Sequence, residues 1–310
     1  MSLQTIVVGT SLSAVSDGIV RTGVAVARAT GAAVWLVHVC APASLPPEIR
    51  KGDTRRLGQQ LETLRSALAE QARRTGLADL PDFHPDRLRL MVGSPAREIL
   101  ALAGAVKADL LVTGPVEGGA LHHVLLGSTA DEVVRKAPCP VLLARSHTDF
   151  PPSRVEIPVD LSMLSAHALR QGLAFLAGLG GPPPRTEVLF ALSPLELEGS
   201  LQFTPDQLKR MAAEELDRFL AGAAEGPSPV PFRRQITTDY PRGAILSALE
   251  DRQVDLAILG THGRGGFKRL VLGSIASEVV RHARCNVLVV PPPPVYSALA
   301  ARNRAREAQA

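Results

Sequence analysis

The chain has 310 residues, enough for about two domains of ordinary size, and 45% of them are hydrophobic. Its 34 Lys and Arg nearly balance 30 Asp and Glu without any long block of one charge, so a protein that wraps nucleic acid is not indicated. No signal-like segment and no apolar run of about eighteen residues occurs, so neither secretion nor a membrane span is expected. Three scattered cysteines favour a reducing cytoplasm over a disulfide scaffold.

Short β-branched runs alternate with longer segments of helical period, which predicts βαβ units with a parallel sheet. In the first half, strands are expected at 3–9, 32–40, 87–92, 109–114 and 140–144, with helices at 14–30, 53–75, 95–105 and 128–137. In the second half, strands are expected at 154–159, 185–192, 232–237, 254–260 and 286–291. Right-handed crossovers then place helices on both faces of each five-stranded sheet.

An internal repeat relates the two halves. A shift of 146 residues aligns 93–143 with 239–289 without a gap, and 19 of those 51 positions are identical. This pattern indicates a duplicated domain. The polar residues and paired prolines of 145–153 predict a linker. We therefore expect one domain at 1–148 and a second at 153–294, followed by an exposed tail at 295–310.

A glycine-rich segment follows the fourth predicted strand of the second half. Its glycines, and the serine that opens the next helix, are Gly260, Gly263, Gly273 and Ser274. Glycine allows backbone N–H groups to curl around an anion, and the helix N-terminus adds unpaired N–H groups and a positive dipole end. Ser274 is expected to cap that helix and to donate to a phosphate oxygen, beside Arg264, Lys268 and Arg269. Spacing alone also permits an ordinary turn with an N-cap and solvated basic residues.

These residues carry a family resemblance. The pattern Gly260-x2-Gly263-x9-Gly273-Ser274, with Cys285-Asn-Val-Leu-Val-Val290 after it, resembles the nucleotide-binding signature of the universal stress protein family. The stretch Val159-Asp160-x-Ser162-x2-Ser165 resembles the first-strand motif of that family. The likeness covers nearly the whole chain twice, so the chain resembles a tandem universal stress protein.

The resemblance implies an α/β fold of two tandem Rossmann-like domains, of the adenine nucleotide alpha hydrolase-like type. Each would be a five-stranded parallel sheet of order 3-2-1-4-5 with helices on both faces, and the two would pair through their last strands as a pseudo-dimer within the chain. It also implies that ATP, with Mg2+ as its usual companion, binds the second domain. Asp160 would lie by the ribose and adenosine, with Leu192 against the adenine. The other binding positions carried over are Gly260, Gly263, Arg264, Gly273 and Ser274.

The first half departs from the pattern. Gly9 is aligned with Asp160, and Glu117 is aligned with Gly263. A carboxylate facing the phosphates would repel a triphosphate, so the first domain is expected to bind ATP weakly or not at all. The alternative is that Glu117 points to solvent and the site survives.

Several other classes of chemistry are unsupported. No Gly-x4-Gly-Lys-Ser/Thr loop, first-strand Gly-x-Gly-x2-Gly or Gly-x-Ser-x-Gly elbow occurs. Cys139 and Cys285 are interpreted as buried hydrophobes. Asp109 and Asp255 are expected to have a capping or turn role, and Trp35 is expected in the core.

The expected function is cytoplasmic regulation of a stress response by ATP binding rather than turnover, so enzyme activity is not expected. Two alternatives stay open. One is slow ATP hydrolysis or self-phosphorylation on Ser274 or Thr261, and the other is a structural or interaction module that binds no nucleotide. A homodimer and an unnamed protein partner are further expectations, whereas nucleic acid and membrane are not.

Overall fold

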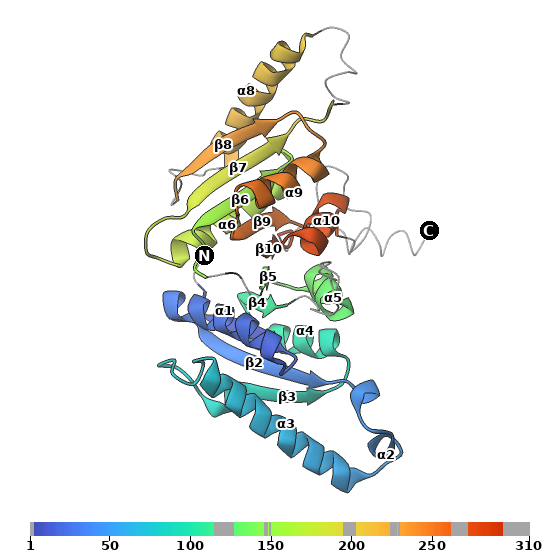
Figure 1. The fold of residues 1–310 in the computed structure, drawn as a ribbon. Coiled ribbons are helices and arrows are strands. Elements are labelled where there is room, and N and C mark those ends of the chain that lie inside the picture. Colours follow the sequence, from blue (N-terminus) through green and yellow to red (C-terminus); the bar gives the residue numbers. More distant parts are fainter. Residues whose placement is uncertain are drawn as a thin grey trace, which may run out of the picture. The chain divides into compact units, whose positions relative to one another are not determined.

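The computed structural model of the protein describes residues 3–114, 127–145, 148, 150–194, 203–223, 228, 230–261 and 272–293. The chain forms two compact units, the first running to Pro151 and the second starting at Pro152 (Figure 1). They are called unit 1 and unit 2 here. Each has its own sheet and its own covering helices.

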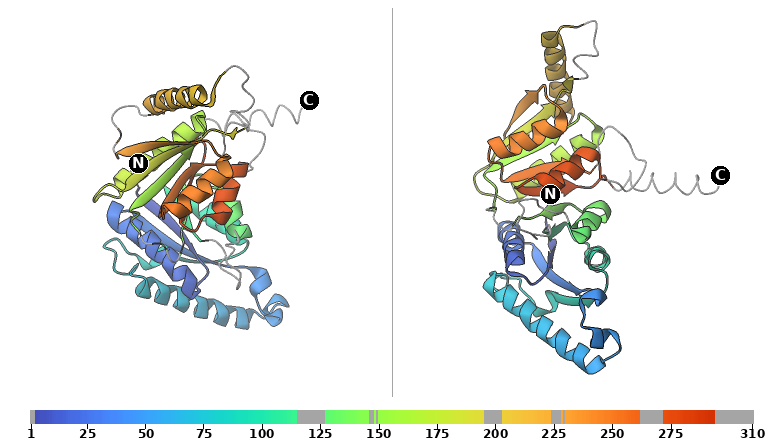
Figure 2. Two further views of the ribbon diagram at one scale, coloured as in Figure 1. Left: turned by 45° about the horizontal axis from the view of Figure 1, so that its top comes forward. Right: turned by 45° about the vertical axis from the view of Figure 1, so that its right-hand side comes forward.

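Unit 1 contains a five-stranded parallel sheet. Its strands are β1 (Thr5–Thr10), β2 (Ala33–Cys40), β3 (Leu88–Val92), β4 (Leu110–Thr113) and β5 (Val141–Leu143). Its helices are α1 (Ala14–Thr30), α2 (Pro47–Arg50), α3 (Thr54–Arg74), α4 (Pro95–Ala105) and α5 (Ser128–Lys136). The strand order is β3-β2-β1-β4-β5. The right-hand view of Figure 2 shows α1 and α3 on one side of this sheet and α4 and α5 on the other, as right-handed crossovers require.

Unit 2 repeats this arrangement. Its strands are β6 (Arg154–Val159), β7 (Arg185–Ala191), β8 (Phe232–Thr237), β9 (Leu256–Gly260) and β10 (Asn286–Val290). Its described helices are α6 (Met163–Gly178), α8 (Pro205–Ala223), α9 (Pro241–Asp251) and α10 (Ser274–His282). The strands are parallel in the order β8-β7-β6-β9-β10. The predicted order 3-2-1-4-5 is therefore confirmed in both units.

The cores lie between the sheets and their helices. Ile6, Val7 and Val8 of β1 are fully buried, as are all residues of β10, because helices cover both faces of each sheet. Glycine allows one helix in each unit to approach its sheet closely. A Cβ on Gly23 would lie 2.6 Å from Cγ2 of Val8, and a Cβ on Gly172 would lie 2.7 Å from Cγ2 of Ile258.

An aspartate just before the fourth strand of each unit holds the start of the first strand. In unit 1, Oδ2 of Asp109 accepts hydrogen bonds from the N–H groups of Gln4 and Thr5 at 2.8 and 2.9 Å. In unit 2, Oδ2 of Asp255 accepts the equivalent pair at the start of β6, at 2.8 Å each. The predicted capping role of these aspartates is confirmed.

The predicted strands and helices all appear within two residues of their expected bounds. The short helix α2 and the 3-10 turns at Pro42–Ser44 and Pro85–Arg87 were not expected. Trp35 is half-buried rather than a core residue, and the Arg89 guanidinium lies 5.8 Å from its ring centre. The predicted tail at 295–310 lies outside the described residues. Among the described helices, none combines the length and apolar character needed to cross a membrane.

Candidate functional site

Asp160 lies at the carboxyl edge of the unit 2 sheet, directly after β6, whose parallel neighbour is β9. Its Oδ1 accepts a hydrogen bond from the N–H of Ser162 at 3.0 Å. Leu161, between them, has a left-handed backbone with φ of 63°. Ser162 then caps α6, because its Oγ accepts from the N–H of Ser165 at 3.1 Å. This turn holds Asp160 at the edge where β6 and β9 end.

The two ends of the glycine segment meet at the same edge. Gly260 is the last residue of β9, in register with Val290 of β10. The N–H of Thr261 donates to the carbonyl of Val290 at 3.2 Å, and the N–H of Gly273 donates to the carbonyl of Thr261 at 2.7 Å. The strand end and the start of α10 are therefore joined by backbone hydrogen bonds. Gly263 and Arg264, together with Lys268 and Arg269, lie outside the described residues.

The N-terminus of α10 differs from the prediction. Its N-cap is Gly273, which has φ of −54° and ψ of 153° and provides no side-chain hydrogen bond. Ser274 is instead the first helical residue and is exposed, so the prediction that Ser274 caps the helix is wrong. A side chain one position inside a helix no longer projects over the first-turn N–H groups. Those N–H groups consequently have no side-chain cap, and the end of the helix dipole can attract an anion.

Leu192 follows β7 and is half-buried. Its N–H donates to the carbonyl of Thr237 at the end of β8, at 2.9 Å. The structure therefore links Gly273 by a hydrogen bond to Thr261, the residue after Gly260, and places Asp160 and Leu192 after adjacent strands. No group of three or more metal-binding side chains gathers in the described part of the chain.

Strand register shows which residues of the two units are equivalent. Ile6 pairs with Leu110, and Val155 pairs with Leu256. Leu110 and Leu256 are aligned in the repeat, so Ile6 corresponds to Val155 and the first strands are related by a shift of 149 residues.

This register corrects the predicted alignment of Gly9 with Asp160, which is wrong. The same shift matches Leu12 with Leu161, and both have φ of 63°. Asp160 therefore corresponds to Ser11. The ungapped repeat starts at residue 93, and the connection before it differs in length between the units, so the repeat does not fix the alignment of the first strands. Glu117 lies outside the described residues.

Polar side chains form a network beside the carboxyl end of β1 in unit 1. Oγ1 of Thr10 donates to Oε1 of Gln71 at 2.7 Å, and Nε2 of Gln71 donates to Oδ1 of Asp17 at 2.7 Å. Arg74 donates to both carboxylate oxygens of Asp17, at 2.7 and 2.9 Å. Gln71 is fully buried and Asp17 is 7% exposed. The network ties α3 to α1 and β1, and Ala166 in unit 2 has no carboxylate to form its equivalent.

Sequence reasoning missed a buried ionic cluster in unit 2. Glu156 of β6 and Glu187 of β7 are register partners and are 1% and 3% exposed. Nη1 of Arg252, which follows α9, donates to Oε2 of Glu156 at 3.1 Å and also to Oε2 of Glu187. The available signal was an acidic residue in the middle of each of two strands expected to be covered on both faces.

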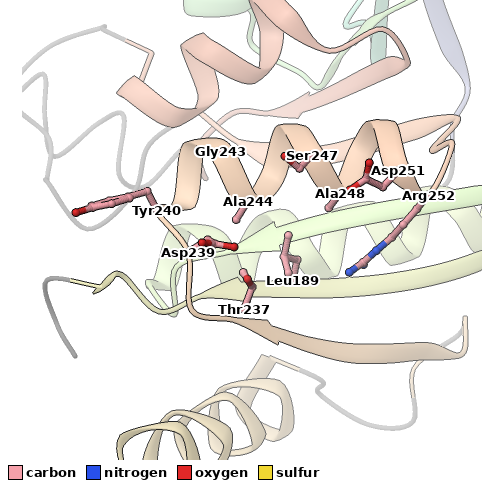
Figure 3. Close-up of a pocket in the computed structure, with 10 residues that line it drawn as sticks. All are labelled: Leu189, Thr237, Asp239, Tyr240, Gly243, Ala244, Ser247, Ala248, Asp251 and Arg252. Carbon is pink, nitrogen blue, oxygen red and sulfur yellow. The ribbon is translucent and has the colours of Figure 1, made fainter. Parts of the chain in front are cut away.

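Arg252 also lines a cavity of about 450 Å³ between α9 and strands β7 and β8. Figure 3 shows its guanidinium directed from the end of the helix toward the strands, with Leu189 and Ala244 farther along the cavity. Among the described residues that line it, none is a predicted nucleotide-binding residue.

The three cysteines are buried and form no disulfide. Burial raises the pKa of the Cys139 thiol to about 12, so this thiol stays protonated and unreactive near neutral pH. The interpretation of Cys139 and Cys285 as buried hydrophobes is confirmed.

Two parallel sheets of order 3-2-1-4-5, each with its helix-starting loops at the carboxyl edge, define a tandem Rossmann-like α/β protein. The sequence model of the universal stress protein family matches residues 2–145 and again 153–291. The chain belongs to the universal stress protein family.

Individual relatives agree with this assignment. A universal stress protein of Mycolicibacterium smegmatis is 28% identical over 304 residues, covering 93% of this chain and 97% of the relative. One from Mycobacterium tuberculosis is 31% identical over 187 residues, covering 59% of this chain and 62% of the relative. The crystal structure of a universal stress protein from Archaeoglobus fulgidus has a TM-score of 0.65 at 16% identity, covering 94% of this chain and 99% of that one, and supports the fold.

Proposed function

We propose that the protein binds one ATP, with its Mg2+, at the carboxyl edge of unit 2 and acts as a regulator in a stress response. Asp160 would contact the ribose and Leu192 the adenine. Backbone N–H groups of the glycine segment and the hydroxyl of Ser274 would hold the phosphates, with Arg264 adding positive charge. Buried cysteines without a disulfide are compatible with the cytoplasmic location expected for such a regulator.

The observation that carries this proposal is the backbone link from Gly273 to Thr261, at 2.7 Å. It brings the end of β9 to a helix N-terminus that has no side-chain cap. Open α/β sheets bind ligands at their carboxyl edges, and uncapped helix N-termini favour phosphate. Family membership supports the proposal, because the proposed binding residues are those that match the nucleotide-binding signature of this family.

A single site per chain is proposed because Ser11 replaces the acid in unit 1 and Glu117 replaces a glycine. Binding without turnover is proposed because the sequence offers no general base for attack on the γ-phosphate. Pairing of the two domains through their last strands, a homodimer and a protein partner stay predictions.

The deciding experiment is to measure the nucleotide released by acid from freshly purified protein, for the native chain and for Gly263→Glu. We expect about one adenine nucleotide per native chain and loss of it in the variant, because a carboxylate in the phosphate loop repels the phosphates. Gly222→Glu on α8 is the control, since a Cβ there would meet no atom within 4 Å.

Absence of nucleotide from the native protein, with no uptake of added Mg-ATP and an unchanged melting curve, would refute ATP binding and favour an interaction module. Equal nucleotide content in Gly263→Glu and the native protein would refute this location of the site. Phosphate release that persists after nucleotide binding is lost would show a contaminating activity and exclude slow hydrolysis by this site.

A further inference from the structure

Unit 2 buries two carboxylates that share one guanidinium nitrogen. Nη1 of Arg252 lies 3.3 and 3.1 Å from the two carboxylate oxygens of Glu156 and also contacts Oε2 of Glu187. Glu187 has a second partner, because its Oε1 accepts from Arg185 at 2.8 and 3.1 Å. In the described part of the chain, Arg252 is the sole cation in contact with Glu156. The more deeply buried carboxylate of the two is therefore the less well paired.

Beyond Arg252 and Arg185, the charged groups near the pair form no ion pair with either carboxylate in the described part of the chain. Arg154, two residues from Glu156 on β6, is exposed and donates to Oε1 of Gln253 at 2.8 Å. On β8, Arg233 is the register partner of Glu187 and is exposed to solvent. On β9, the register partner of Glu156 is Ala257, which carries no charge. The remaining charged side chains of α9 are Arg242, Glu250 and Asp251.

Unit 1 lacks this cluster although its fold is the same. Strand register matches Glu156 with Val7 and Glu187 with Trp35, and the repeat matches Arg252 with Val106. The corresponding strands and helix of unit 1 therefore pack with apolar side chains. The fold does not require an ionic cluster at this place.

Ionisation of both carboxylates is costly in this setting. A buried carboxylate loses hydration, which is the largest cost here, and a neighbouring carboxylate adds to that cost, while the attraction of the guanidinium offsets only part of it. Burial raises the pKa of Glu156 to about 7, an effect that Arg252 and, more weakly, Arg185 oppose and that Glu187 increases. Glu156 therefore gains or loses a proton near neutral pH.

We propose that Glu156, Glu187 and Arg252 form a proton-responsive latch that fixes the end of α9 to the sheet of unit 2. With Glu156 protonated, Arg252 pairs with Glu187 and the end of α9 is held firmly. With Glu156 ionised, the buried excess negative charge favours opening of the helix end, which admits water to the cluster.

An ion pair connects α9 to α10. Nη2 of Arg242, near the start of α9, lies 2.6 Å from Oε2 of Glu278 on α10. Helix α10 starts at Ser274, in the proposed nucleotide site. The latch itself does not rest on nucleotide binding, and it is tested on protein stripped of nucleotide.

The sign of the pH dependence follows from the raised pKa. Below about pH 4.5, Glu156 is protonated in both the closed and the open state. Between about 4.5 and 7, the closed state keeps a proton that the open state releases, so closure weakens as the pH rises. With these two pKa values, the opening equilibrium of α9 increases about tenfold between pH 6 and pH 8.

Hydrogen exchange of the full chain at pH 6 and pH 8, corrected for intrinsic rates and read by mass spectrometry, tests this inference. Peptides from α9 should lose about tenfold in protection at pH 8, whereas peptides from α4 should not change. Glu156→Gln and Glu156→Val should both abolish the pH dependence of α9 protection, because neither side chain titrates. Valine is the residue that unit 1 has at the equivalent position, Val7. Glu250→Gln, which alters an exposed acid of α9, should keep it.

Equal α9 protection at the two pH values in the native chain would overturn the latch, as would the same pH dependence in both Glu156 variants. A carboxyl carbon NMR titration of the native chain provides a measurement that needs no variant. A Glu156 pKa near 4.5 would overturn the proposal even if the variants failed to fold. A failure of ATP binding would leave all these outcomes unchanged.

Discussion

Gly114 follows β4 at a place where there is no room for a side chain. A Cβ on this residue would overlap Cδ1 of Ile19 and lie 2.9 Å from its Cγ1. Ile19 is buried in α1, so the clash cannot be relieved by swinging the side chain into solvent. The glycine that marks this position in the sequence pattern is therefore also required for packing, whether or not unit 1 binds a ligand.

We expect Gly114→Ala to lower the free energy of unfolding of unit 1 by about 1–3 kcal/mol, the usual cost of overpacking. Urea unfolding followed by fluorescence of Trp35 reports on unit 1, because this tryptophan is the only one and lies in β2. Gly104→Ala is the control, since a Cβ there meets nothing within 4 Å and alanine favours the helix by up to about 1 kcal/mol. Equal stability of the two variants would contradict the packing argument.

Ser274 and Ser128 are equivalent first residues of α10 and α5, and neither is the N-cap. We expect Ser274→Ala to weaken ATP binding roughly tenfold or more through loss of a hydrogen bond to a charged group. Ser128→Ala should leave ATP binding unchanged. Isothermal titration calorimetry with Mg-ATP measures both. An equal loss of affinity in the two variants would locate binding in both units and contradict the single-site proposal.

Among single residues, the sequence predicted the glycine pattern and Asp160, because a phosphate-binding turn would need particular residue types at short, fixed spacing; these assignments stay predictions. It did not reveal the cluster of Glu156, Glu187 and Arg252. Those three residues are far apart in the chain and meet only through strand register and the position of a helix end. The assignment of Ser274 as a cap failed because helix bounds read from sequence are uncertain by a residue or more.

Helix α3 is attached to unit 1 by only a few buried residues, namely Leu68, Gln71 and Ala72. Its polar contacts with α1 are therefore a large part of its attachment. The hydrogen bond from Arg74 lowers the pKa of Asp17 below the ordinary value of 3.8. Because the pKa of Asp17 is lowered, its ion pair with Arg74 stabilises the folded state above pH 3.8, and this stabilisation is lost as the pH falls below that value.

We expect Arg74→Ala to destabilise unit 1 by about 2 kcal/mol at pH 7, because a nearly buried carboxylate loses its charged partner. Arg73→Ala is the matched control. Its side chain is 65% exposed and its partner Glu70 is 55% exposed, so less than about 0.5 kcal/mol is expected. Trp35 fluorescence in urea measures both, and the difference between the variants should shrink toward pH 3. A difference that persists at that pH would show that Arg74 acts through packing alone.

Periodicity predicted the long helices and the strands because each presents a repeating apolar face to a core. The short helix α2 (Pro47–Arg50) has too few residues to show any period. Its position depends on Ile49, which packs with Cys40 and Leu45 and with residues of α3, a contact between separate parts of the chain.

The proposed number of bound nucleotides is a property of the whole molecule, since two units share one fold and differ in their candidate site residues. Strand register identifies Ser11 as the position of the missing acid. We expect Ser11→Asp combined with Glu117→Gly to raise nucleotide content from about one toward two per chain. Acid release and chromatography measure it, and an unchanged content would show that other differences close the site in unit 1.

Gly9→Asp with Glu117→Gly serves as the contrast. Gly9 is buried in β1, and a Cβ on it would lie 3.3 Å from Cδ1 of Ile99, so the new carboxylate would be buried against an apolar side chain. This pair should destabilise unit 1 without adding a nucleotide. The contrast depends on the alignment of Ser11 with Asp160. The ungapped repeat does not provide this alignment, whereas strand register does.

Leu12 and Leu161 share a left-handed conformation that costs a residue with a Cβ roughly 1–2 kcal/mol. Both copies have kept it since the duplication, although only one has an acid on the turn. The backbone of this turn has thus been inherited independently of any particular chemistry. Gain or loss of a ligand during the history of such paired domains requires a change of side chains on an existing turn, and the two halves can specialise without altering their architecture.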